Sequence, residues 1–144
     1  MLIDNESINL KKPDSICYSD EVFGIKKRIP VPYFTNKTEL VPEIDKGYVF
    51  DETTTISILF GLKHNKKVLI QGLHGTGKSS HIEQVAARLN WPCLRINLDG
   101  HISRFDLLGK DAITLENEKQ ITTFRQGMLP WSVQNPVALV FDEY

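Results

Sequence analysis

The chain has 144 residues, with 17 Lys and Arg against 18 Asp and Glu, and a formal net charge of −1. This length suits one domain with a buried core, and the balanced charge argues against a nucleic-acid-binding face. Cys17 and Cys93 lie far apart and form no CxxC pair, so no disulfide framework is predicted. No signal-peptide core precedes Asn9 and no apolar run approaches the roughly 18 residues of a membrane span, so we expect a cytoplasmic protein without a membrane segment.

Residues 1–47 contain four of the seven prolines and charges of both signs. Because a proline favours extended backbone before it, we expect a lead-in arm with one short element around residues 19–25. Two interpretations stay open for this arm: a loosely ordered tail, or a segment that packs on a neighbouring subunit.

A helix and a strand are expected next. Asp51 is a favourable N-cap residue and predicts a helix that runs to about Lys63. The apolar face of this helix is expected to hold Ile56, Leu59 and Phe60. The short apolar run Val68–Ile70 is then typical of a buried strand. Residues 48–50 either line a pocket for a nucleotide base or pack in the core.

Residues 72–79 read Gly-Leu-His-Gly-Thr-Gly-Lys-Ser and fill every fixed position of the phosphate-loop pattern G-x-x-x-x-G-K-[ST]. The apolar residues that follow are spaced as one face of a helix: Ile82, Val85, Ala86 and Leu89. The loop therefore lies between a predicted strand and a predicted helix. In that context, backbone N–H groups and a helix N-terminus bind phosphate.

This motif predicts a site for ATP and Mg²⁺. Lys78 is expected to reach the β- and γ-phosphates, and the Ser79 hydroxyl to hold the Mg²⁺ ion. The residues expected to contact the nucleotide are Gly72, Leu73, His74, Gly75, Thr76, Gly77, Lys78, Ser79 and Ser80.

The elements after the loop helix alternate between strand and helix. Leu94–Leu98 alternates in polarity and predicts a strand, and Ser103 is expected to begin a short helix. The runs 112–115 and 120–124 flank a polar stretch and predict a projecting hairpin. A short helix is expected near residues 128–131. This order indicates an α/β fold with a parallel sheet and flanking helices.

The sequence closes with Val137-Ala138-Leu139-Val140-Phe141-Asp142-Glu143-Tyr144. A continuous apolar run is typical of a strand buried on both faces, and two acids at its end are typical of a Walker B motif. We expect Asp142 to join the Mg²⁺ shell and Glu143 to orient the attacking water. Glu143 and Lys78 are the predicted catalytic residues.

Other conspicuous residues favour structural roles. Trp91 and Trp131 adjoin turns and are expected to fill the core. The four histidines include no pair at the i, i+4 spacing of a helical metal site, so no structural metal is predicted. Arg104 or Arg125 either acts on a neighbouring subunit's phosphate or is a solvent-facing or ion-paired arginine, and we favour the second.

The segment Gly72–Cys93 resembles the ATPase subunits of aerobic cobaltochelatases, the CobS family of AAA+ ATPases close to the MoxR-type branch. The resemblance covers the chain from about residue 20 onward, and includes Phe50–Thr54, Gly109–Ala112 and Val137–Tyr144. The phosphate loop itself is common to many ATPases, whereas the stretch His81–Cys93 is far more discriminating.

This resemblance implies that residues 48–144 are the N-terminal part of a P-loop AAA+ domain, with a hairpin-like insert over residues 103–126. It implies a ring of this subunit that works with a second AAA+ type subunit and a large catalytic subunit. ATP hydrolysis would drive Co²⁺ into a corrin precursor, hydrogenobyrinic acid a,c-diamide, in cobalamin biosynthesis. The tetrapyrrole and the cobalt would be held by the large subunit.

Family members continue through a sensor-1 strand, an arginine finger and a helical lid with sensor 2. None of these maps onto the present sequence, so we expect a core that is incomplete at the C-terminus and binds ATP with little hydrolysis alone. The alternatives are a MoxR-like chaperone for protein remodelling or metal insertion, and a non-hydrolysing nucleotide-binding fragment. A small-molecule kinase fits less well, because paired acids at the strand end suit hydrolysis better.

Overall fold

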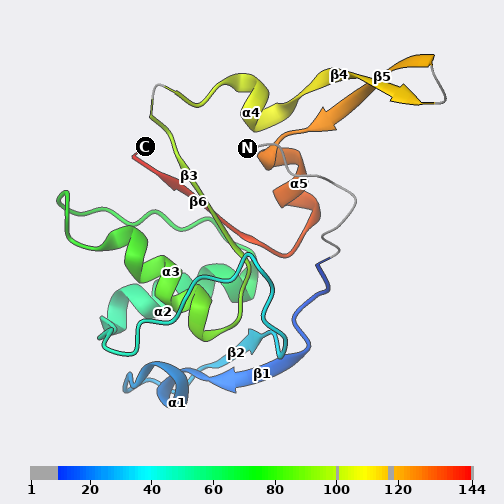
Figure 1. Cartoon of the computed structure of the whole chain (residues 1–144). Coiled ribbons are helices and arrows are strands. Elements are labelled where there is room, and N and C mark those ends of the chain that lie inside the picture. Colours follow the sequence, from blue (N-terminus) through cyan, green and yellow to red (C-terminus); the bar gives the residue numbers. More distant parts are fainter. Residues whose placement is uncertain (1–9, 100, 117–118, 144) are drawn as a thin grey trace. The chain divides into compact units, whose positions relative to one another are not determined.

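The computed structural model describes residues 10–99, 101–116 and 119–143 (Figure 1). Two compact units are distinguished: residues 12–95 with 137–140, and the described residues of 1–11, 96–136 and 141–144. In chain order the elements are β1 (Ser15–Tyr18), α1 (Ser19–Phe23), β2 (Pro30–Tyr33), α2 (Glu52–His64), α3 (Lys78–Arg88), β3 (Cys93–Asn97), α4 (Arg104–Leu108), β4 (Gly109–Glu116), β5 (Lys119–Gln126), α5 (Met128–Gln134) and β6 (Ala138–Asp142).

Strands β3 and β6 form a parallel pair. At its beginning the Ala138 N–H donates to the Pro92 carbonyl at 2.8 Å, and at its end the Leu98 N–H donates to the Asp142 carbonyl at 2.9 Å. Both strands therefore run in the same direction, as the alternation of strands and helices in the sequence predicted. The predicted α/β class with a parallel sheet is confirmed.

Helix α3 is anchored in the core of the first unit by the predicted apolar face. Val85 and Leu89 are completely buried and Ala86 is 1 % exposed, while Ile82 is partly buried against them. The completely buried side chains lie four residues apart, so each stacks on the previous turn. Burial of a Val or Leu side chain contributes about 1.5–3 kcal/mol, which fixes this helix in place.

Helix α2 packs beside α3 and begins as predicted, because the Asp51 carboxylate accepts the Thr54 N–H at 2.8 Å. The predicted apolar face of α2 included Phe60, and this prediction was wrong, because Phe60 is 54 % exposed. The side of α2 that faces the core is a stripe at the spacing i, i+3, i+4 and i+7, formed by Thr55, Ile58, Leu59 and Leu62. Phe60 lies outside this stripe.

The described part of the N-terminal arm is packed on the core of the first unit. β1 and β2 pair antiparallel, with Cys17 opposite Val31, and α1 follows β1 directly. The Ser19 hydroxyl at the start of α1 donates to the carbonyl of Lys27, in the loop between α1 and β2, at 2.6 Å. Val31 is completely buried and Phe23 is 6 % exposed. These residues are thus part of this chain's own core rather than a loosely ordered tail.

The buried strand expected at Val68–Ile70 is absent. Residues 66–71 carry no regular structure, and Leu69 is 83 % exposed. A strand needs a neighbour to satisfy its backbone groups, and no described strand forms a ladder with this segment. Only Ile70 contacts the core. An apolar, β-prone run alone was therefore not enough to form a strand.

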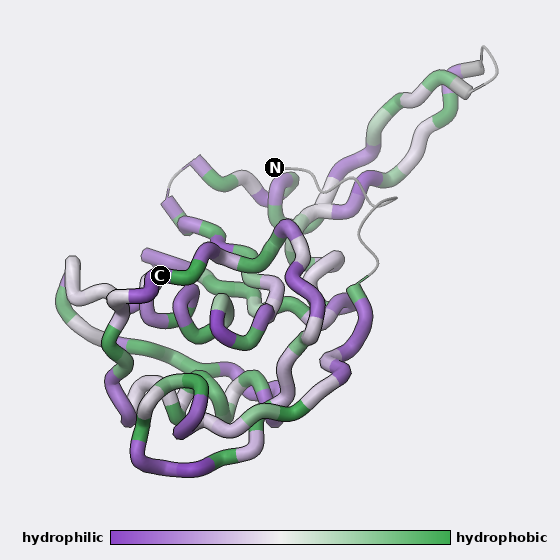
Figure 2. The backbone as a smooth tube through the Cα atoms, turned by 60° about the horizontal axis from the view of Figure 1, so that its bottom comes forward, coloured by the Kyte–Doolittle hydropathy of each residue, from purple (hydrophilic) through white to green (hydrophobic). Residues whose placement is uncertain are grey.

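The second unit contains the predicted hairpin. The Ser103–Asp106 capping box starts α4, and β4 pairs antiparallel with β5 from Gly109 opposite Gln126 onward. Figure 2 shows hydrophobic and hydrophilic positions interspersed along both strands. The side chains of Ile113, Leu115 and Phe124 are exposed. The predicted hairpin is confirmed and its strands are longer than expected, while residues 117–118 of the predicted turn lie outside the described residues.

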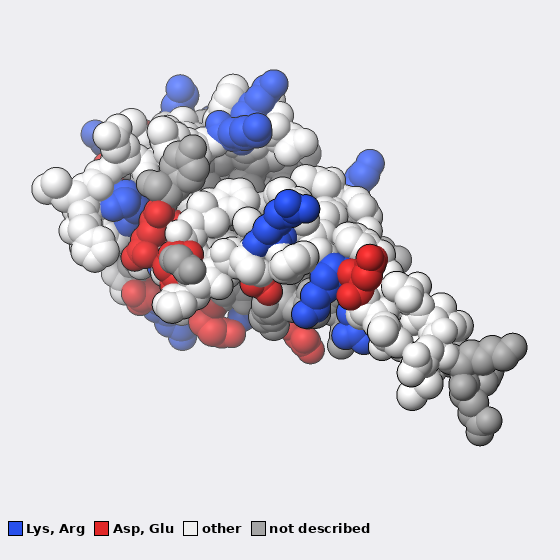
Figure 3. Space-filling model, turned by 90° about the horizontal axis from the view of Figure 1, so that it is seen from above, with Lys and Arg blue, Asp and Glu red and all other residues white. Residues whose placement is uncertain are grey.

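On the face shown in Figure 3, acidic and basic side chains are interspersed. Among the described helices, none combines the length and the apolar character needed to cross a bilayer.

The orientation of α2 can be tested with two neighbouring residues. Leu59, which is 1 % exposed, should lose about 2–5 kcal/mol of unfolding free energy when changed to Ala. Phe60→Ala should cost less than about 1 kcal/mol, because this ring is largely in solvent. Urea unfolding followed by circular dichroism measures both. Equal losses for the two variants would contradict the observed face of α2.

Candidate nucleotide site

The phosphate loop has the backbone that its glycines allow. Gly75 and Gly77 have φ values of 77° and 79°, in the left-handed region that residues with a Cβ avoid. Gly77 is the N-cap of α3, and its carbonyl accepts the His81 N–H at 2.9 Å. The loop therefore leads directly into the first turn of a helix. There the N-terminal N–H groups and the positive end of the helix dipole favour an anion.

Lys78 carries its charge at the loop. Its Nζ donates to the Gly72 carbonyl at 3.0 Å and to the Leu73 carbonyl at 2.7 Å. The Thr76 hydroxyl donates to the same Leu73 carbonyl at 2.8 Å. Among the predicted ligands, residues 72–77 and Ser80 are exposed and Lys78 and Ser79 are partly buried. The loop thus presents a cation and glycine backbone to solvent.

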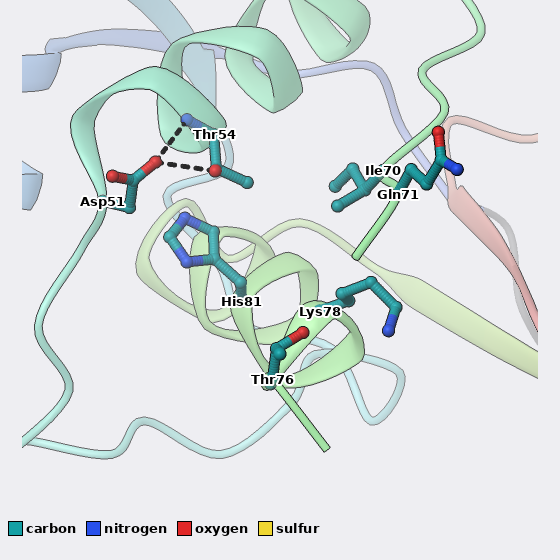
Figure 4. A pocket seen from close by; sticks show the side chains of 8 residues that line it. Asp51, Thr54, Ile70, Gln71, Thr76, Lys78 and His81 are labelled. Atoms are coloured by element: carbon teal, nitrogen blue, oxygen red, sulfur yellow. Dashed lines mark hydrogen bonds between the residues drawn. The ribbon is translucent and has the colours of Figure 1, made fainter. Parts of the chain in front are cut away.

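A hollow of about 190 Å³ adjoins the loop (Figure 4). One side is formed by the loop and the first turn of α3, and the other by the beginning of α2, with His81 between them. Its lining residues are Asp51, Thr54, Ile70, Gln71, Thr76, Gly77, Lys78 and His81. The hollow therefore continues from the phosphate loop to the beginning of α2.

Asp51 serves both as a helix cap and as a wall of this hollow. Its Oδ2 accepts from the Thr54 N–H at 2.8 Å and from the Thr54 hydroxyl at 2.7 Å. These hydrogen bonds hold the pKa of the Asp51 carboxyl below its usual value. The carboxylate is therefore ionised over the whole neutral range and keeps the start of α2 in place.

His81 is the best-connected side chain of the site. It is 6 % exposed, with Nδ1 2.9 Å from the Tyr48 hydroxyl and Nε2 2.9 Å from the Thr55 hydroxyl. Burial lowers its pKa, and the attraction of the Asp51 carboxylate opposes this shift only partly. The neutral ring satisfies both bonds, because it donates at one nitrogen and accepts at the other.

Sequence analysis missed the role of His81, although a signal was present. His81, Val85 and Leu89 are spaced i, i+4 and i+8 and share the buried face of α3. A histidine at a buried helix position needs polar partners, which here come from the segment before α2 and from α2 itself.

Residues 48–50 were expected either to line a pocket for a nucleotide base or to pack in the core. None of the three lines the hollow, whose wall from this part of the chain consists of Asp51 and Thr54. The Phe50 ring packs edge-on against Phe23, with centroids 5.0 Å apart. Val49 is 86 % exposed. Packing is therefore the observed role of Tyr48 and Phe50.

The predicted Walker B acids lie at the end of β6, in the second unit. β6 ends at Asp142, and the Glu143 N–H donates to the Asp142 Oδ1 at 3.1 Å. Glu143 is exposed and has a φ of 57°, so the chain turns sharply after the strand. Ser79 belongs to the first unit and Asp142 to the second. Within the described ranges, no group of three or more His, Cys, Asp or Glu could hold a metal ion.

Residues 67–144 match the AAA domain (dynein-related subfamily), so the chain belongs to this family. It is 54 % identical over 142 residues, 99 % of its own length, to the aerobic cobaltochelatase subunit CobS of a Sinorhizobium species. The resemblance drawn from the sequence is thereby confirmed. The chain spans 42 % of the length of that curated relative. No solved structure matches the chain.

The state of His81 predicts how stability depends on pH. Its pKa in the folded chain lies below the ordinary 6.5, so the unfolded chain binds the proton more readily. The free energy of unfolding should therefore fall as pH drops from about 7.5 to about 5.5. Urea unfolding of the wild type and of His81→Gln at both pH values isolates this contribution. A variant that loses as much stability on acidification as the wild type would contradict it.

Proposed function

We propose that this chain binds ATP on residues 72–80 and forms the ATP-binding motor part of a cobaltochelatase-type AAA+ subunit. The observation that carries the ATP site is a glycine-bent loop that enters α3 with the Lys78 ammonium held against it. Backbone N–H groups and a lysine at a helix N-terminus are the groups that phosphoryl-transfer proteins use to hold triphosphates.

Binding of the triphosphate would replace the present hydrogen-bond acceptors of Lys78 with phosphate oxygens. Lys78 Nζ now donates to the neutral carbonyls of Gly72 and Leu73. A phosphate oxygen carries a full charge, and a charge-assisted hydrogen bond is roughly twice as strong as a neutral one. Lys78 therefore swings from these carbonyls to the β- and γ-phosphates, where it lowers the barrier to transfer as a catalytic residue.

Mg²⁺ is assigned to Ser79 and Asp142. Oxygen donors suit this ion, which is usually held by one or two carboxylates together with the phosphates of the nucleotide. Ser79 supplies a hydroxyl in the first turn of α3, and Asp142 supplies a carboxylate at the end of β6. When bound, Mg²⁺ neutralises charge on the β- and γ-phosphates.

Glu143 is assigned to the attacking water. It directly follows β6, is exposed and has a φ of 57°, so the backbone turns between the two acids. Two adjacent acids can thus serve two roles, one toward the metal and one toward water.

We infer that residues 48–144 are the N-terminal part of the AAA+ domain, and that the whole subunit couples ATP hydrolysis to Co²⁺ insertion into a corrin precursor. The support is the 54 % identity to a protein named as a cobaltochelatase subunit. As such a subunit, it works as a ring of identical copies with a second AAA+ type subunit and a large catalytic subunit.

A chain that binds ATP without turning it over is the second candidate. It is favoured by one observation: residues 66–71, immediately before the loop, pair with no described strand, and all of them except Ile70 are exposed. A segment without strand partners holds the loop less rigidly than a sheet would, and phosphoryl transfer depends on positioning. A fast ATPase rate of the purified chain would exclude this candidate.

Lys78→Ala should abolish saturable ATP binding, because it removes the cation that meets the β- and γ-phosphates. Isothermal titration calorimetry with ATP and Mg²⁺ measures the loss. Lys63→Ala is the matched control, since this exposed lysine lies in the last turn of α2. Undiminished binding by Lys78→Ala, or an equal loss in the control, would contradict the assignment.

Asp142→Asn should remove much of the gain in ATP affinity that Mg²⁺ provides, while binding in the presence of EDTA stays unchanged. The amide keeps the shape of the carboxylate but loses its charge. Competition with a fluorescent ATP analogue, with and without Mg²⁺, gives both affinities. A variant with the full Mg²⁺ gain would show that this carboxylate is not a metal ligand.

The partner assignment has its own test. The chain, co-expressed with a large chelatase subunit, should co-elute with it in size-exclusion chromatography when ATP and Mg²⁺ are present. Lys78→Ala should weaken this ATP-dependent association. Separate elution under all conditions would favour a different partner for the motor.

A further inference from the structure

His81 joins the two sides of the hollow beside the phosphate loop. Its backbone N–H donates to Gly77 at the end of the loop, at 2.9 Å. Its ring reaches the opposite way, with Nδ1 2.9 Å from the Tyr48 hydroxyl and Nε2 2.9 Å from the Thr55 hydroxyl. Thr55 directly follows Thr54, which lines the hollow. One buried residue thus connects the loop with the wall that faces it.

The other contacts between α3 and the segment before α2 lie farther from the hollow. Gln84 accepts the Asp45 N–H at 2.9 Å and donates to the Glu43 carbonyl at 3.0 Å. Arg88 donates to the Asp45 carbonyl at 2.9 Å. Neither Gln84 nor Arg88 lines the hollow. These hydrogen bonds do not involve His81, so this segment stays attached to α3 when the His81 bonds are removed.

The shape of the hollow suits the part of a nucleotide that the loop does not hold. Phosphates that lie on the loop and at the N-terminus of α3 leave the sugar and the base in the space that continues from Thr76 and Lys78. That space ends at Asp51 and Thr54, whose carboxylate and hydroxyl groups offer polar contacts. His81 is hydrogen-bonded to both sides, to Gly77 at the loop and to Thr55 in α2.

We propose that His81 is a positioning residue that sets the Asp51–Thr54 wall against the phosphate loop, so that the hollow holds the base and sugar of the bound nucleotide. The inference rests on the proposed ATP site and deepens it. His81 touches neither the phosphates nor the reacting atoms, and it acts through the wall. Its contribution is therefore confined to the affinity that the base and sugar add.

The experiment compares two probes, ATP and inorganic tripolyphosphate, by calorimetry on the full chain. His81→Phe keeps an aromatic ring and removes both hydrogen bonds, so ATP affinity should fall about tenfold while tripolyphosphate affinity changes less than about twofold. Tyr48→Phe removes a single oxygen and should lower ATP affinity by about threefold. His64→Phe is the matched control, since this exposed histidine in α2 lies outside the hollow, and both affinities should persist.

Each other outcome overturns the proposal. Equal loss of ATP and tripolyphosphate in His81→Phe would mean a general effect on the loop or on folding, and no loss would mean no role. Equal affinity of the wild type for the two probes would show that the hollow adds nothing, while the phosphate site itself stands. If the wild type binds neither probe, the proposed ATP site fails and this inference fails with it.

Discussion

The fixed N-terminus of α3 is the constraint on which the rest of the site depends. Gly77 adopts its left-handed backbone at little cost because it lacks a Cβ, and this lets the chain turn from the loop into the helix at Lys78. Val85 and Leu89 hold the helix by complete burial. A helix end favours an anion within its first turn only, so its position must be set this firmly to be useful.

The same helix also organises the chain around the site. Its apolar face enters the core, while His81, Gln84 and Arg88 bind the segment that leads into α2. One element therefore supplies the end that receives phosphate, the anchor in the core and the attachment of the opposite wall. Changes in this helix should consequently affect binding and stability together, whereas changes at His81 should lower the affinity for ATP more than the affinity for tripolyphosphate.

Features that depend on local chemistry were predictable from the sequence. The cap at Asp51, the capping box at Ser103 and the buried face of α3 each follow from interactions between residues a few positions apart. The α/β class with a parallel strand pair followed from the alternation of such segments.

Features that depend on partners far away in the sequence were not predictable. The run Val68–Ile70 has the composition of a strand, but no described strand pairs with it, and Leu69 is left exposed. Phe60 is apolar, yet the stripe of α2 that meets α3 is the one with Thr55. His81 has two partners, 33 and 26 positions away, which no local pattern reveals.

The central claim, that a nucleotide binds at the loop before α3, is tested most directly by NMR of the ¹⁵N-labelled chain titrated with ATP and Mg²⁺. The largest shifts of backbone amide signals are expected within residues 72–80, where the N–H groups would meet phosphate, with smaller shifts at Asp51 and Thr54. A spectrum in which residues 72–80 do not respond at saturating ATP, or in which the response centres on the hairpin of β4 and β5, would contradict the claim.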